Sequence, residues 1–353
     1  MARFSCLSSV FLRAYPDPSY RSLRSALAGV HGLDADFFLP GNGAAELITW
    51  AARDAAAQGS STIPSPGFAD YTRALRCWSA AFTTYQLPLE WSSPGPSPFK
   101  PLAMSATSSQ GCIWITNPHN PTGVLWDRSS LLPLLTRFAL VIVDEAFLPL
   151  VPDGEAHSLI HDVPLHPNLV VLRSLTKLYG SAGLRVGYAV AQPERLQRWS
   201  SWRDPWPVNG PAAHIAQSFL ADRLGYQQHC AAVQSWTQRE GHWLGNQLSV
   251  LPGLRVMPSS ANFLLLRSKG SEPWTTLTPL REALQRRHRI LLRDCSSFAS
   301  LGPAWLRLGF QRRTGNRRLV RALRQEVRRT LGDGASDIGF SGATASMSTS
   351  QEL

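Results

Sequence analysis

The chain of 353 residues is 44% hydrophobic, which suffices for one large domain and a smaller one, and it contains no apolar run of membrane-spanning length. Its first residues lack the long apolar core of a signal peptide, so we expect a soluble, cytoplasmic protein. Five scattered cysteines without a Cys-x-x-Cys pair argue against a disulfide framework and a structural zinc site, so we expect no metal.

The first predicted helix follows Tyr15 and runs to about His31. Asp17 or Ser19 can cap it, and Pro18 suits its first turn. These capping residues place the start of the helix near the beginning of the chain.

A second helix is expected after an apolar run ending at Leu39 and the turn 41–43 (Gly-Asn-Gly). A turn that leads into a helix presents unpaired N–H groups and the positive end of the dipole, which suits a phosphate. Gly-x-Gly alone is a weak signal, because a dinucleotide site would want a third glycine where Glu46 stands.

The next segments are a possible strand from Ser60 to Pro64 and a helix that opens at 66–71 (Pro-Gly-Phe-Ala-Asp-Tyr). From Trp91 to Ser109 the chain is rich in proline and serine and shows no period. This composition predicts an exposed loop.

Three apolar runs then predict buried strands: Gly111 to Thr116, Ala139 to Val143 and Leu169 to Leu172. The third leads to Lys177, one of only three lysines among 35 basic residues. A lysine kept from water loses part of its preference for the charged form and becomes a usable amine nucleophile, able to form a Schiff base. The alternative is a surface lysine on a loop.

The pattern of apolar residues in the C-terminal half predicts a long helical stretch followed by a smaller α/β unit. The expected elements are a strand at 184–190, helices at 193–203 and 212–248, strands at 261–266, 290–292 and 305–310, and helices at 276–287 and 316–331. Beyond Gly332 the tail is rich in Gly, Ser, Ala and Thr, which predicts disorder.

The net charge of +11 raises nucleic acid as a partner, since many arginines gather in the last third of the chain. However, arginine replaces lysine almost everywhere, which indicates a compositional habit, and no recognised nucleic-acid-binding motif accompanies the charge. We therefore favour a small-molecule partner over nucleic acid.

Three motifs in order resemble the fold-type I, class I/II aminotransferases that use pyridoxal 5'-phosphate (PLP). They are 117–123 (Asn-Pro-His-Asn-Pro-Thr-Gly), 144–147 (Asp-Glu-Ala-Phe) and Ser-x-x-Lys at 174–177 with Arg185 beyond it. The resemblance covers roughly Tyr15 to Leu331. It implies an α/β fold with a mostly parallel seven-stranded sheet between helices and a small C-terminal α/β domain. We assign an N-terminal arm and helix (1–32), a large PLP-binding domain (33–240), a small domain (241–331) and a disordered tail (332–353).

The resemblance also implies roles for individual residues. Lys177 and Asp144 would be catalytic, Lys177 bound to the cofactor and Asp144 facing its pyridine nitrogen. Cofactor contacts would come further from Gly43, Ala44, Ala45, Ser174 and Arg185 at the phosphate, Asn120 at the ring oxygen, Phe68 stacked on the ring, and Tyr15 reaching across a homodimer.

Arg307 would bind the substrate carboxylate and Arg293 a substrate phosphate. Each assignment has a plainer alternative: core packing for Phe68, a turn cap for Asp144, an aromatic staple for Tyr15 and ordinary surface charge for Arg293.

Within the family, the closer resemblance is to the threonine-phosphate decarboxylases of cobalamin synthesis, with the histidinol-phosphate aminotransferases second. Phe147 supports this, because many aminotransferases have tyrosine there. The expected reaction is decarboxylation of L-threonine O-3-phosphate to (R)-1-aminopropan-2-yl phosphate. The alternatives are transamination of histidinol phosphate or another amino acid, and a PLP-binding protein with impaired catalysis. The last follows from the short stretch before Tyr15, where these enzymes carry a segment that covers the active site.

Overall fold

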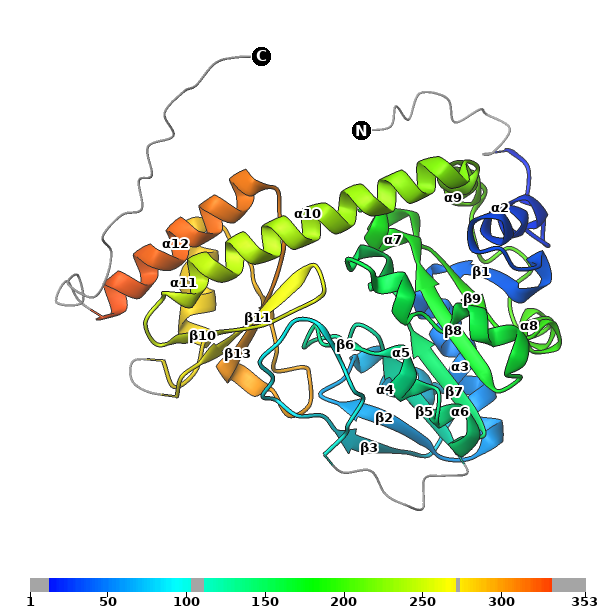
Figure 1. The fold of residues 1–353 in the computed structure, drawn as a ribbon, viewed down its shortest axis with the longest axis horizontal. Coiled ribbons are helices and arrows are strands. Elements are labelled where there is room, and N and C mark those ends of the chain that lie inside the picture. Colours follow the sequence, from blue (N-terminus) through cyan, green and yellow to red (C-terminus); the bar gives the residue numbers. More distant parts are fainter. Residues whose placement is uncertain (1–12, 103–110, 271–273, 332–353) are drawn as a thin grey trace, which may run out of the picture.

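The computed structural model describes residues 13–102, 111–270 and 274–331. Its larger part is a seven-stranded sheet in the order β1-β9-β8-β7-β5-β2-β3 (Figure 1). The run from β8 to β3 is parallel, and β9 is antiparallel to both of its neighbours. The strands are β1 Phe38–Asn42, β2 Ser61–Ser65, β3 Phe82–Gln86, β5 Cys112–Thr116, β7 Leu140–Asp144, β8 Leu169–Ser174 and β9 Val186–Val190.

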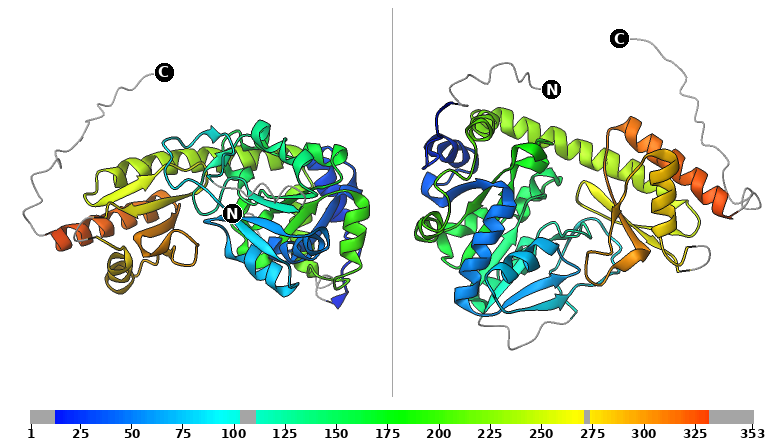
Figure 2. Two further views of the ribbon diagram at one scale, coloured as in Figure 1. Left: turned by 90° about the horizontal axis from the view of Figure 1, so that it is seen from below. Right: turned by 180° about the vertical axis from the view of Figure 1, so that it is seen from behind.

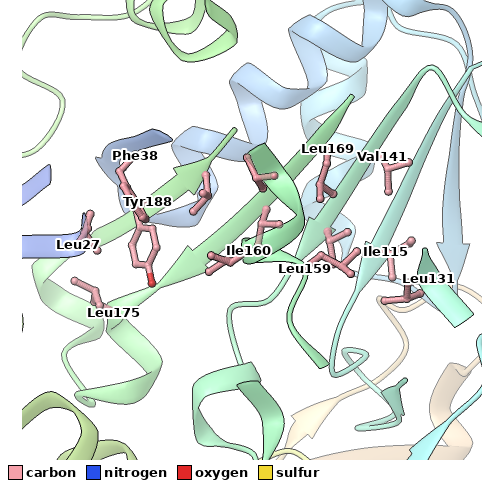
Figure 3. Close-up of a cluster of buried hydrophobic side chains, with 14 of the residues drawn as sticks. Leu27, Phe38, Ile115, Leu131, Val141, Leu159, Ile160, Leu169, Leu175 and Tyr188 are labelled. Atoms are coloured by element: carbon pink, nitrogen blue, oxygen red, sulfur yellow. The ribbon is translucent and has the colours of Figure 1, made fainter. Parts of the chain in front are cut away.

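Helices cover both faces of this sheet, which is why its central strands read as unbroken apolar runs. Alternate residues of one strand enter opposite cores: Val141 and Val143 join the cluster shown in Figure 3, whereas Leu140 and Ile142 pack on the other face. The helices of this part are α2 Arg21–His31, α3 Gly43–Gln58, α4 Ala69–Cys77, α5 Arg128–Leu131, α6 Leu134–Arg137, α7 Leu175–Leu178, α8 Pro193–Ser200 and α9 Gly210–Leu220.

The smaller part is an antiparallel sheet in the order β10-β11-β13-β12. The long helix α10 runs from the large sheet to this small one, as Figures 1 and 2 show. The elements of this part are α10 Arg223–Ser249, β10 Leu254–Met257, β11 Phe263–Ser268, α11 Thr278–His288, β12 Arg293–Asp294, β13 Trp305–Gly309 and α12 Arg313–Leu331. A short parallel pair, β4 Pro96–Ser97 with β6 Leu125–Trp126, forms a separate two-stranded sheet.

The α/β architecture with a mostly parallel seven-stranded sheet and a small second sheet is confirmed. The division into domains at residue 240 stays a prediction, since it falls inside the continuous helix α10. The predicted tail at 332–353 and most of the predicted arm before Arg13 lie outside the described residues. In the described ranges, no helix has both the length and the apolar character needed to cross a membrane.

Several local predictions were wrong for identifiable reasons. The helical stretch 212–248 is two helices, because Asp222 interrupts it and its carboxylate caps α10 by accepting from the Leu224 N–H. The strand expected at 290–292 is displaced to β12, since Arg289 ends α11 in the left-handed region. Strand β10 was not predicted at all.

The predicted loop 91–109 is only partly exposed in its described portion. Phe99 is buried against Tyr85 and Trp126, and the Trp91 indole donates to the Pro258 carbonyl at 2.7 Å. Aromatic residues therefore anchor a segment whose proline and serine content indicated exposure.

Near the beginning of the chain, Pro18 precedes α2 instead of entering its first turn.

Candidate active site

The polar residues that follow the central strands lie together at one edge of the large sheet. β5, β7 and β8 are parallel and in register, with Thr116 opposite Asp144 and Asp144 opposite Leu172. Their carboxyl ends therefore bring Asp144, the 117–123 turn and the segment that contains Lys177 to the same edge. Open α/β sheets bind their ligands at this edge.

Asp144 is the buried acid of the site, with 6% of its surface exposed. Its Oδ2 accepts from the Tyr71 hydroxyl at 2.8 Å and its Oδ1 from the Ala146 N–H at 3.0 Å. Because Tyr71 gives its only proton to Asp144, Thr116 Oγ1 donates to the Tyr71 oxygen at 2.8 Å.

Burial raises the pKa of Asp144, while the hydrogen bonds from Tyr71 and Ala146 and the charge of Lys177 oppose that rise. A buried carboxylate oriented by two donors is suited to hold a cation. The protonated pyridine nitrogen expected from the sequence is such a cation, so this residue fits the cofactor.

Lys177 lies in α7, one turn beyond the end of β8. Its side chain is exposed, so the expectation that it is kept from water is wrong for the side chain as a whole. The protein around the amine nevertheless lowers its pKa, first through partial desolvation and then through the positive charges of Arg307 and Arg185, with Asp144 opposing. Its Nζ stands 5.3 Å from the centre of the Phe147 ring. The amine is thus accessible and easier to deprotonate than an ordinary lysine.

The amino end of α3 and the start of β9 form a cradle suited to a phosphate. Gly43 has a φ of 73°, and a Cβ there would lie 2.6 Å from Arg185 Nη2. A Cβ on Gly187, which pairs with Ser174, would lie 2.8 Å from the Ala44 nitrogen. Only glycine permits both close approaches.

The same cradle is electropositive. The first N–H groups of α3, which belong to Gly43, Ala44 and Ala45, have no partner within the helix. Arg185 donates to the Ala182 carbonyl and forms no ion pair with any residue in the described part of the chain. Ser174 Oγ lies 2.7 Å from Thr176 Oγ1. Helix dipole, guanidinium and hydroxyl groups together suit a dianionic phosphate.

Arg307 on β13 connects the small sheet to this edge of the large one. Its Nη1 donates to Oδ1 of Asn120, which leaves the amide hydrogens of Asn120 available to a ring oxygen. Its guanidinium lies 4.9 Å from the Phe263 ring centre. Burial lowers the pKa of Arg307, and the nearby positive charge of Arg293 adds to that effect.

Arg293 is the neighbour of Arg307 across the β12–β13 pair. The two guanidinium groups lie 5.6 and 5.9 Å from the same ring, that of Phe298, and Arg293 also donates to Ser297 Oγ at 2.7 Å. Among the described residues neither arginine forms an ion pair. The two cations therefore stand side by side, and the nearest acidic influence on them is Asp294, whose pKa the charge of Arg293 helps to lower.

The two remaining residues predicted to contact the cofactor, Phe68 and Tyr15, lie in different places. Phe68 begins α4 with 36% of its surface exposed, and its ring meets the edge of Tyr71 at 5.7 Å, which places it beside the Asp144 group. Tyr15 is 79% exposed and packs on Trp206 at 4.5 Å. A role for Tyr15 in a neighbouring subunit stays a prediction.

Sequence reasoning missed Tyr71, Thr116 and Thr176. Tyr71 could have been suspected, because it lies one helical turn beyond Phe68 and therefore on the same side of α4. It also missed the ion group beneath the site, in which fully buried Arg173 binds Glu145 and Glu155.

Comparisons with known proteins show the family of this chain. The sequence profile of the family described as aminotransferase class I and II matches residues 7–323. A threonine-phosphate decarboxylase from Salmonella typhimurium is 33% identical over 321 residues, covering 89% of this chain and 83% of its own. A histidinol-phosphate aminotransferase from Symbiobacterium thermophilum is 31% identical over 328 residues, covering 92% and 84%.

Among solved structures, the L-threonine-O-3-phosphate decarboxylase from Porphyromonas gingivalis superimposes with a TM-score of 0.76 at 27% identity, over 90% of this chain and 91% of that one. The profile spans most of the chain, and both relatives exceed 30% identity across more than two thirds of it. The chain therefore belongs to the class I and II aminotransferase family and is a PLP-dependent enzyme.

Proposed function

We propose that this protein decarboxylates L-threonine O-3-phosphate to (R)-1-aminopropan-2-yl phosphate. The observation that carries the proposal is the pair Arg293 and Arg307, two neighbouring guanidinium groups that form no ion pair among the described residues. A substrate with a carboxylate at one end and a phosphate at the other needs two such cations. The similarity to named threonine-phosphate decarboxylases supports the same substrate.

In this proposal the cofactor lies across the edge of the large sheet. Asp144 would hold its pyridine nitrogen, Asn120 its ring oxygen, Phe68 the face of its ring and Lys177 its carbonyl carbon. The cradle formed by Gly43, Ala44, Ala45, Ser174 and Arg185 would hold its phosphate. When bound, PLP draws electrons away from the Cα of an amino acid, so that a bond to that carbon can break.

The residues of the chain then set which bond breaks and what replaces it. Arg307 would bind the carboxylate and Arg293 the phosphate, which fixes the amino acid at both ends. The bond between Cα and the carboxyl carbon breaks, carbon dioxide leaves and one proton takes its place on Cα. The Lys177 amine would carry that proton, and its lowered pKa supports this role.

Transamination of histidinol phosphate or another amino acid is the second candidate. The similarity to a histidinol-phosphate aminotransferase favours it, and the same arginines could bind a phosphorylated amino acid. The two reactions differ in which Cα bond stands perpendicular to the cofactor ring.

Carbon dioxide release tests the proposal. Purified protein with PLP should release carbon dioxide from L-threonine O-3-phosphate, and the Lys177→Ala variant should not. Release no greater than that of the variant would overturn the proposal. Formation of a 2-oxo product in its place would establish the aminotransferase, and tight cofactor binding without either product would indicate impaired catalysis.

We further propose a homodimer in which Tyr15 reaches the cofactor phosphate of the other subunit. Its 79% exposure leaves it free for such a contact. Light scattering should give twice the mass of the chain, and a monomer would contradict the assignment.

A further inference from the structure

A cavity of about 520 Å³ lies at the junction of the large and small sheets. One wall is the middle of α10, with Thr237, Gly241 and Gly245. Leu264 of β11 also lines it, whereas Phe263, its neighbour along the strand, contacts Arg307. None of the active-site residues described above is among the described residues that line it, so this cavity is separate from the active site.

The lining of this cavity indicates an uncharged occupant. Among the described residues that line it there is no Asp, Glu, Lys or Arg, and the one titratable side chain is that of His242. Prolines, Val151, Met257 and Leu264 supply apolar surface, and hydroxyl and amide groups supply polar points. Small-molecule sites have this composition of apolar walls with a few hydrogen-bonding groups.

The cavity wall is joined to the active site by the backbone. The Ser260 N–H donates to the Gly123 carbonyl at 2.8 Å. Ser259 packs closely against the same glycine, since a Cβ on Gly123 would lie 2.0 Å from the Ser259 Oγ. Gly123 ends the turn that carries Asn120, the acceptor for Arg307. A molecule that rigidifies Ser259 and Ser260 would therefore stabilise the position of Asn120.

We propose that this cavity is a binding site for a small, uncharged, partly apolar molecule with at least one hydrogen-bonding group, and that its occupancy is transmitted to the Asn120 turn. The site is independent of which reaction the active site performs.

The neutral fluorescent amine N-phenyl-1-naphthylamine is a suitable probe, because it has an apolar body and one N–H. The full chain with PLP bound should take up one equivalent and become more fluorescent. Gly245→Leu should weaken binding at least tenfold, since a Cβ at Gly245 meets no atom within 4 Å and the larger side chain would fill the cavity. Gly29→Leu, at a helical glycine of α2 with equally open surroundings, should bind the probe like the unchanged protein.

Retention of PLP absorbance shows that each variant is folded. No saturable uptake by the full chain, or equal uptake by the Gly245→Leu and Gly29→Leu proteins, would overturn the binding site.

Amide hydrogen exchange tests the connection to the active site. Probe binding should slow exchange at Ser260 and across the 117–123 turn in the unchanged protein. Unaltered exchange in that turn at saturating probe would overturn the transmission.

Discussion

Removing the Tyr71 hydroxyl should weaken cofactor binding more than it weakens the fold. Tyr71→Phe keeps the buried ring but deletes the donor to Asp144 Oδ2, a bond of 2.8 Å to the acid that would hold the pyridine nitrogen. A hydrogen bond to a charged group contributes about 1.5–3 kcal/mol. If the whole contribution of this hydrogen bond is lost in the PLP-bound protein, the affinity for PLP falls by about 10- to 150-fold, since about 1.4 kcal/mol corresponds to a factor of ten.

The pH dependence of this loss has a definite sign. The Tyr71 hydrogen bond lowers the pKa of Asp144, so its removal raises that pKa further above the model-peptide range. More of the acid is then protonated and unable to pair with a pyridinium. The affinity deficit should therefore shrink as the pH rises through the new pKa of Asp144. In the cofactor-free chain, the folded state holds this proton more tightly than the unfolded state, so ionisation of Asp144 reduces stability as the pH rises above 3.8.

Tyr85→Phe is the matched control. Tyr85 is also buried, at 1% exposure, and its hydroxyl donates at 2.8 Å to the Trp114 carbonyl instead of a carboxylate. Both variants should lose some thermal stability, but only Tyr71→Phe should lose PLP affinity in an absorbance titration across pH. Equal affinities for the two variants would refute the reasoning that Tyr71 sustains the charge of Asp144.

Three further predictions concern the surroundings of the site. Arg173→Ala should lower the free energy of unfolding by about 3–5 kcal/mol in urea denaturation, because it leaves Glu145 charged and buried without its partner. A loss below about 1 kcal/mol, which is the level of a surface ion pair, would contradict this prediction. Gly43→Ala should weaken PLP binding by about 1–3 kcal/mol in the absorbance titration, because the backbone at φ 73° would be strained and Arg185 displaced. An affinity equal to that of the unchanged protein would show that the cradle tolerates a methyl group. Arg307→Lys should raise the KM of the amino acid substrate about tenfold or more through loss of a two-point contact, while leaving PLP absorbance intact; an unchanged KM would remove Arg307 from the substrate site.

The local sequence determined most of the elements that carry chemistry. Unbroken apolar runs identified β5, β7 and β8, since strands covered on both faces need no polar alternation. Asp144 and the Lys177 segment follow two of these strands, and the family resemblance made them candidates for the site. The parallel sheet gathers those strand ends at one edge. The glycine turn before α3 likewise indicated an anion cradle from local helix-end chemistry alone.

Contacts between distant segments were decided only by the tertiary structure. Nothing near Tyr71 in the sequence indicates Asp144, 73 positions away, and nothing near Asn120 indicates Arg307, 187 positions away. The exposure of Lys177 and the partial burial of the 91–102 segment also depend on what packs above them. The sequence by itself fixes backbone periodicity, helix ends and residue chemistry, whereas pairings across the chain depend on how the two sheets dock, which no local pattern encodes.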